Sequence, residues 1–239
     1  MASRTLRSIS LAVLFATLSL TQVHAQQAAS GFRPPDDLAF RTATIISEGT
    51  RMAAEVFSPK SATGKKLPTI VMSHGWGGVA ANLRSDAVVF ARAGYLVVTF
   101  DYRGWGASDS RVVLTKPPTP PQPKRSPDRR LMAEVLVVRE VVDPIDQTAD
   151  LLNAVSWVYG EPACDRQRIG LWGSSYSGGH VVYAAARDPR IKALVSQVPA
   201  LDSRWVLLGN NAREQTFNEA ADRTHGELGY PPPGARVIG

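Results

Sequence analysis

The segment at residues 168–179, with the sequence RIGLWGSSYSGG, constrains the fold of this chain more than any other feature. An apolar run leads into Ser175, which has Gly173 two residues before it and Ser177 and Gly178 two and three residues after it. Small residues at this spacing are typical of a strand–turn–helix element with a serine on a strained turn, because bulky neighbours would collide there. The first amides of the following helix favour an anion at the same spot. The segment therefore predicts that Ser175 is a nucleophile.

Two other interpretations of this segment are an ordinary Gly/Ser turn at a strand end and a phosphate-binding loop. No Gly-x-x-x-x-Gly-Lys-Ser/Thr pattern occurs in the chain, and residues 173–178 lack the Gly-x-Gly-x-x-Gly spacing of a dinucleotide loop. The phosphate-loop interpretation is excluded on this ground. The choice between a nucleophile and a plain turn depends on the rest of the sequence.

The first 25 residues have the three parts of a secretory signal. Arg4 and Arg7 form a basic region, residues 9–20 form an apolar core, and residues 23–25 (Val-His-Ala) form a small-residue cleavage site. A membrane anchor is the alternative, but about a dozen apolar residues is well short of the roughly 20 that span a bilayer. We expect cleavage after residue 25 and a secreted or periplasmic protein with no stable membrane span. A lipid anchor is not indicated, because no cysteine lies beside the cleavage site.

Charge and cysteine content narrow the possible partners and cofactors. Removing the signal leaves 25 basic and 21 acidic side chains, a net charge of about +4. Basic residues in the proline-rich interval 110–130 have no aromatic residues among them, which indicates a solvated loop and not a nucleic-acid surface. Cys164 is the only cysteine, so neither an intramolecular disulfide nor a Cys-rich zinc site is possible. The sequence implies no metal and no organic cofactor.

Hydrophobic patterning predicts one α/β domain at residues 39–239, after a flexible segment at 26–38. The interval 110–130 is expected to cross the surface as an extended loop because it holds six prolines. The alternation of strands and helices predicts a mostly parallel sheet with helices on both faces, with Ser175 after the fifth strand. The expected strands are 40–47 and 51–57 (a hairpin), 69–73, 95–100, 168–172 and 191–198, the last of them buried, and the expected helices are 82–93, 146–159 and 177–187.

Two loops at strand ends support a nucleophilic role for Ser175. The glycine-rich loop 74–78 (HGWGG) follows the third strand, and the amides of Trp76 and Tyr176 are the expected oxyanion donors. His74 is either catalytic or, as we favour, holds this loop by hydrogen bonds. The loop 101–108 (DYRGWGAS) follows the fourth strand, and its Asp101 and Arg103 are expected to form an internal ion pair, not to act as catalytic charges.

Together these three ordered segments, 74–78, 101–108 and 173–179, resemble the α/β-hydrolase superfamily. Within it the chain is similar to X-prolyl dipeptidyl-peptidase-like and dienelactone-hydrolase-like serine hydrolases, over roughly residues 40–202. The resemblance implies a serine nucleophile, an oxyanion hole, and then an acid and a histidine later in the chain.

The acid and the histidine depart from the family's pattern. Asp202 has the less common position of the acid, after the sixth strand. His180 lies in the helix that follows Ser175 and is expected to serve packing, while His225 ends a predicted amphipathic helix, so neither matches the usual base. We expect either that the chain is truncated at its C-terminus or that a cap segment begins at Trp205.

These observations predict an exported serine hydrolase that acts on a small-molecule acyl or peptide substrate through an acyl-serine intermediate. The bond cleaved is expected to be an ester, or else a peptide or lactone bond. An acyltransferase on the same fold is one alternative. A catalytically silent hydrolase-like fragment that lacks its acid and histidine is the other, and weak activity is expected from the chain as given.

Overall fold

The computed structural model describes residues 31–116 and 132–202, together with Glu214, Asn218 and Ala221. The predicted signal segment 1–25, Trp205 and His225 all lie outside the described residues. No helix in the described part of the chain is long and apolar enough to cross a membrane.

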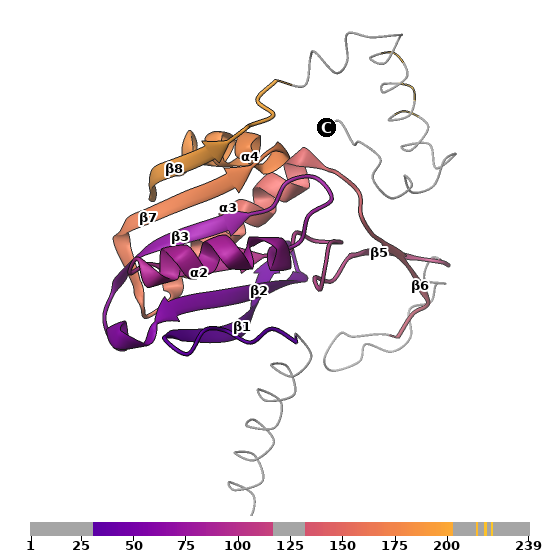
Figure 1. Ribbon diagram of the computed structural model, residues 1–239. Coiled ribbons are helices and arrows are strands. Elements are labelled where there is room, and N and C mark those ends of the chain that lie inside the picture. The colour runs from indigo at the N-terminus through magenta and orange to yellow at the C-terminus, as the bar shows by residue number, and fades with distance from the viewer. Residues whose placement is uncertain (1–30, 117–131, 203–213, 215–217, 219–220, 222–239) are drawn as a thin grey trace, which may run out of the picture.

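A six-stranded sheet forms the centre of the molecule (Figure 1). Strands β3, β4, β7 and β8 run parallel, while the hairpin β1–β2 joins antiparallel at the β4 side. This arrangement confirms the predicted mostly parallel sheet, with five of its strands before Ser175 and one after it. The order across the sheet is β1 (Leu38–Ser47), β2 (Thr50–Pro59), β4 (Leu96–Phe100), β3 (Leu67–Ser73), β7 (Cys164–Ser174) and β8 (Ile191–Gln197).

Helices cover both faces of this sheet, as predicted (Figure 1). Helix α2 (Arg84–Arg92) packs on one face against β2 and β4, while α3 (Pro144–Gly160) and α4 (Tyr176–Ala185) pack on the other face. Two short 3-10 turns, η1 (Lys60–Ala62) and η2 (Ala80–Leu83), complete the elements around the sheet. Asp143 begins α3 by accepting hydrogen bonds from the amides of Ile145 and Asp146, both 3.0 Å long.

Alternate residues of each buried strand enter two separate cores, because successive strand side chains point to opposite faces. Val98 and Leu171 belong to the core under α3 and α4, whereas their neighbours Val97 and Trp172 belong to the core under α2. The continuous apolar runs of these strands thus correspond to burial on both faces.

A second, two-stranded sheet lies at one end of the molecule (Figure 1). It pairs β5 (Arg111–Leu114) antiparallel with β6 (Val135–Val138). The interval 110–130 was expected to be extended loop throughout, and its beginning is instead a strand. The β-branched residues of β5 find their partners in β6, on the far side of the proline-rich interval, and such pairing depends on contacts distant in sequence.

Strand β8 differs from its prediction in burial. Residues 192–195 and Gln197 are exposed, although the sequence predicts a buried strand at 191–198. The reason is its place: β8 is the outermost strand in the described part of the sheet, so its far edge and much of both faces remain open.

Candidate active site

Ser175 occupies the turn between β7 and α4, where the sequence places a nucleophile. Its backbone takes the strained conformation φ 57°, ψ −120°, which non-glycine residues rarely adopt. The Ser175 amide donates to the Gln197 carbonyl over 2.9 Å, and the Ser175 carbonyl accepts from the amides of Gly178 and Ala200, each over 3.0 Å. These bonds hold the strained turn in place, and they leave the residue exposed to solvent.

The small residues of the motif are required by the closeness of neighbouring backbone. A Cβ atom built on Gly173 would lie 2.5 Å from the Ser177 carbonyl oxygen, and one built on Gly178 would lie 2.9 Å from the Pro199 Cα atom. Side chains at these positions would force the turn apart. The spacing that identifies the turn in the sequence therefore has a steric cause.

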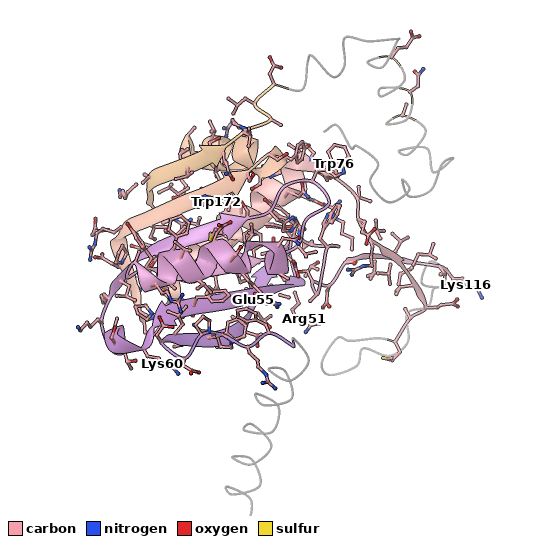
Figure 2. The ribbon with its side chains drawn as sticks, viewed as in Figure 1. Arg51, Glu55, Lys60, Trp76, Lys116 and Trp172 are labelled. Atoms are coloured by element: carbon pink, nitrogen blue, oxygen red, sulfur yellow. The ribbon has the colours of Figure 1, made fainter. Side chains whose placement is uncertain are left out.

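The glycine-rich loop after β3 packs directly against Ser175. A Cβ atom on Gly75 would lie 3.0 Å from the Ser175 Cβ atom and 3.6 Å from its Oγ atom. The ring of Trp76 meets the ring of Tyr176 edge to face, with centroids 5.7 Å apart. Figure 2 labels Trp76 at the end of the sheet where β3 and β7 stop. The three site residues that the sequence predicts, Ser175, Trp76 and Tyr176, thus come together in space.

A buried group of hydroxyls joins the segments behind the nucleophile. The Ser73 Oγ atom at the end of β3 hydrogen-bonds the Ser177 Oγ atom in α4. The Tyr102 hydroxyl donates to the same Ser177 Oγ atom over 3.2 Å and lies 3.3 Å from the Nδ1 atom of His180. Burial raises the pKa of Tyr102 to about 12, so this hydroxyl stays protonated at neutral pH. The cluster links the glycine-rich loop to the helix that begins at Tyr176.

Sequence reasoning misses this hydroxyl cluster, and only a weak signal could have found it. Ser73 ends an apolar strand and Ser177 is the second residue of the helix after the turn, and both are fully buried. The hydroxyl of a serine at the end of a buried strand is expected to be buried, and a buried hydroxyl needs a hydrogen-bond partner. Which partner it has depends on how the loops meet, and the sequence does not show that.

His74 and His180 are buried beside this cluster and are unsuited to act as the base. The Nδ1 atom of His74 lies 3.0 Å from the Gly75 carbonyl oxygen, so its hydrogen bond is to its own loop, as the favoured interpretation expects. Burial lowers the pKa of His74, and burial with the nearby His74 lowers the pKa of His180 to about 4. Within residues 31–116 and 132–202, no histidine hydrogen-bonds the Ser175 hydroxyl.

The remaining candidates for the acid and the base are Asp202 and His225. Asp202 is exposed in the segment after β8. His225 lies outside the described residues. Among the residues that the structure describes, no cluster of three or more His, Cys, Asp or Glu side chains is placed to hold a metal ion.

Asp101 and Arg103 do not form the internal ion pair that the sequence predicts. The Asp101 carboxylate accepts from the amides of Ala80 and Ala107, over 2.6 and 2.8 Å, and thereby fixes two loops at this end of the sheet. The backbone runs so close that a Cβ atom on Gly106 would overlap the Asp101 carboxylate. Both residues have structural roles, as expected, but with partners other than each other.

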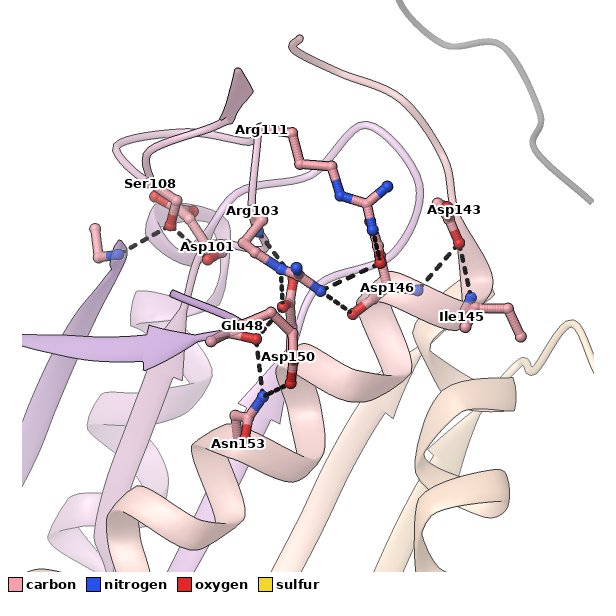
Figure 3. Close-up of polar contacts among 12 residues, drawn as sticks. Glu48, Asp101, Arg103, Ser108, Arg111, Asp143, Ile145, Asp146, Asp150 and Asn153 are labelled. Atoms are coloured by element: carbon pink, nitrogen blue, oxygen red, sulfur yellow. Dashed lines mark hydrogen bonds and ion pairs between the residues drawn. The ribbon is translucent and has the colours of Figure 1, made fainter. Parts of the chain in front are cut away.

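Arg103 pairs instead with two acids of helix α3 (Figure 3). Its backbone amide and its side chain both donate to the buried carboxylate of Asp150, and its guanidinium also lies 3.3 Å from Asp146. Asp146 pairs in turn with Arg111 of β5. These bonds hold the loop after β4 against α3. The charges of Arg103 and Asp150 are buried, and a buried charge is costly unless it is paired.

A model of the X-Pro dipeptidyl-peptidase (S15) family matches residues 48–229. An uncharacterized 31.7 kDa protein of Escherichia coli is 33% identical over 165 residues, which are 66% of this chain and 48% of that protein. The polyketide transferase grgF of Penicillium is 28% identical over 194 residues, covering 79% of this chain and 51% of that protein.

Among solved structures, the hypothetical protein PA2218 of Pseudomonas aeruginosa superposes with a TM-score of 0.62 at 26% identity, covering 84% of this chain and 57% of that one. The chain spans about half the length of the curated relatives that it matches. Because the family model covers most of the chain, this chain belongs to the X-Pro dipeptidyl-peptidase (S15) family, within the α/β hydrolases.

Proposed function

We propose that this protein is an exported serine hydrolase that cleaves a carboxylic ester through an acyl-Ser175 intermediate. The observation that carries the proposal is the strained Ser175 turn with the backbone of Gly75 against its side chain. A turn of this kind exposes a hydroxyl and brings two chain segments to it, and acyl transfer needs both.

In the proposed reaction the Ser175 Oγ atom adds to the ester carbonyl. The amides of Trp76 and Tyr176 would stabilise the negative charge that develops on the carbonyl oxygen. The alcohol then leaves with a proton, and water releases the acid from the acyl-serine. A base must accept the serine proton, and His225 is the candidate for that role.

Transfer of the acyl group to another acceptor is the second candidate. It is supported by the similarity to a protein named a polyketide transferase, which covers 79% of this chain. The chemistry up to acyl-Ser175 is the same, and only the group that attacks the acyl-serine differs. Turnover that rises with an added alcohol or amine acceptor would favour the transferase.

The proposed nucleophile is tested by turnover of p-nitrophenyl acetate. If the unsubstituted protein turns over the ester efficiently, we expect Ser175→Ala to reduce turnover by about 10⁴-fold or more. If the unsubstituted protein has only trace activity, we expect Ser175→Ala to reduce it to the rate of the uncatalysed reaction. Ser174→Ala is the matched control, since it changes the neighbouring serine of the same turn. Equal rates for the parent and Ser175→Ala would favour the catalytically silent alternative, and loss of activity only in Ser174→Ala would place the nucleophile one residue earlier.

Export is proposed from the first 25 residues, whose basic, apolar and small-residue regions follow the order of a secretory signal. The mature chain should begin at Gln26 when the protein is made in an exporting host. Mass spectrometry of the purified protein measures this, and an intact Met1 would contradict it.

A further inference from the structure

A groove of about 520 Å³ lies beside the Ser175 turn, on the face of the sheet that α3 and α4 cover. Its walls come from the first half of α3, from α4, and from the residues that follow β8. A volume of this size falls within the range of ordinary small-molecule sites. The largest apolar side chains in its walls are Ile145, Leu152, Tyr176, Tyr183 and Leu201.

This groove adjoins the proposed nucleophile on two sides. Tyr176, which lines it, directly follows Ser175 in the chain, and the Tyr176 ring also contacts the exposed Trp76. Ala200, which lines it as well, donates its amide to the Ser175 carbonyl over 3.0 Å. The groove thus lies next to residues that adjoin or hold the Ser175 turn.

The described residues that line the groove offer no charge to a substrate. None of them is an Asp, Glu, Lys or Arg, and burial keeps the lining His180 neutral at pH 7. Of the acids next to lining residues in the chain, Asp143 caps α3 and Asp146 pairs with Arg103 and Arg111, while Asp202 directly follows the lining Leu201. An ammonium group inside this groove would lose its water without meeting a carboxylate among the described lining residues, which is costly. An alkyl chain would meet no such cost.

We propose that this groove binds the alkyl chain of a medium-chain acyl ester, and thus that the substrate class is hydrophobic acyl esters and not peptides with a free amino terminus. The inference rests on the proposed function of Ser175. When the serine hydroxyl displaces the alcohol, which leaves with the serine's proton, the acyl chain on Ser175 lies along α3 and α4. Water then adds to the acyl carbonyl and releases the fatty acid.

The test compares kcat/KM for p-nitrophenyl acetate, butyrate and octanoate with that for the amine-bearing Gly-Pro-p-nitroanilide, using the full chain. We expect octanoate to exceed acetate by about tenfold or more, because burying two methylenes already accounts for a factor of that order. Gly-Pro-p-nitroanilide should give the lowest value. A value for it above that of every ester would overturn the proposed substrate class.

The Ile145→Glu variant places a charge in the groove wall. Ile145 is 58% exposed in the first turn of α3, where an acidic residue suits the helix, so folding should be preserved. We expect this variant to lower the octanoate-to-acetate ratio of kcat/KM by about tenfold. The matched control is Val89→Glu on α2, which is 64% exposed on the other face of the sheet and should keep the parent ratio.

Three outcomes separate the groove from the nucleophile. A flat dependence on chain length, with turnover that still needs Ser175, would overturn the groove assignment and leave the proposed function standing. An unchanged ratio in Ile145→Glu would overturn the assignment in the same way. Turnover that does not need Ser175 would overturn both.

Discussion

The two ends of the central sheet differ in how far their apolar side chains are covered. At the β1–β2 end, Phe57 and Met52 are completely buried, and Phe32 and Phe40 pack against Phe57 with ring centroids 6.0 and 5.0 Å away. At the β8 end, Leu194 and Val195 are 39% and 50% exposed on neighbouring positions of one strand. Apolar side chains are therefore expected to contribute very differently to stability at the two ends.

The uncovered end also includes a hollow on the face of the sheet that α2 occupies. This hollow measures about 440 Å³ and is lined by apolar side chains that include Ile70, Phe90, Trp172 and Val195. Exposed apolar patches of this kind mark places where other protein surface binds or where chains associate. Residue composition thus specifies a strand but not its neighbours, and the burial of a strand depends on what packs over it.

Phe57→Ala is expected to have the largest effect on stability. Phe57 is completely buried in the core under α2, with the rings of Phe32 and Phe40 against it, so its removal leaves a cavity in a closed core. We expect the free energy of unfolding to fall by about 3–5 kcal/mol. Urea denaturation followed by circular dichroism measures the change.

Val195→Ala is the matched change at the open end of the sheet. It also truncates an apolar side chain on a strand, but that side chain is half exposed. We expect a change within about 0.5 kcal/mol. A loss of about 2 kcal/mol, the size expected for a buried valine, would show that β8 is covered in solution and would contradict the contrast between the two ends.

Acid should also destabilise the protein, by somewhat less than Phe57→Ala does, because it acts on the buried His180 of α4. Burial and the nearby His74 lower its pKa from 6.5 to about 4, so the unfolded chain binds this proton more tightly than the folded chain does. The free energy of unfolding should therefore be highest above pH 6.5 and fall as the pH drops toward 4. The contribution of His180 is about 3 kcal/mol over that range.

The control for this pH effect is His180→Gln, which can still hydrogen-bond the Tyr102 hydroxyl. Urea midpoints of the parent and the variant are compared at pH 7, 5.5 and 4. The variant should lose part of the decline, and the remainder includes a contribution from His74, whose pKa is also lowered by burial. Identical declines in both proteins would contradict the assignment of this effect to His180.

Most of the fold follows from sequence because its strands and helices have strong local patterns. The hairpin, the parallel strands and the three helices all occur near their predicted ranges. The sheet β5–β6 and the exposure of β8 were not predicted, since each depends on partners distant in the chain or on their absence from the described part of it. The local sequence pattern determines that a segment is a strand, while its neighbours in space determine which strand it pairs with and how far it is buried.

The candidate site shows the same division. Ser175 and its small neighbours could be predicted because sterics restrict the turn to those residue types. The pairing of Arg103 with Asp150 could not, because helix α3 delivers that carboxylate from 47 positions further along the chain. The hydroxyl cluster of Ser73, Ser177 and Tyr102 is likewise a product of three segments that meet only in the folded chain.

The most direct test of the central claim is covalent labelling of the protein with a fluorophosphonate, followed by intact-mass measurement and peptide mapping. We expect a single adduct on Ser175, absent from Ser175→Ala and retained in Ser174→Ala. An adduct on Ser174 or Ser177, or a folded protein that takes up no label, would contradict the claim that Ser175 is an activated nucleophile.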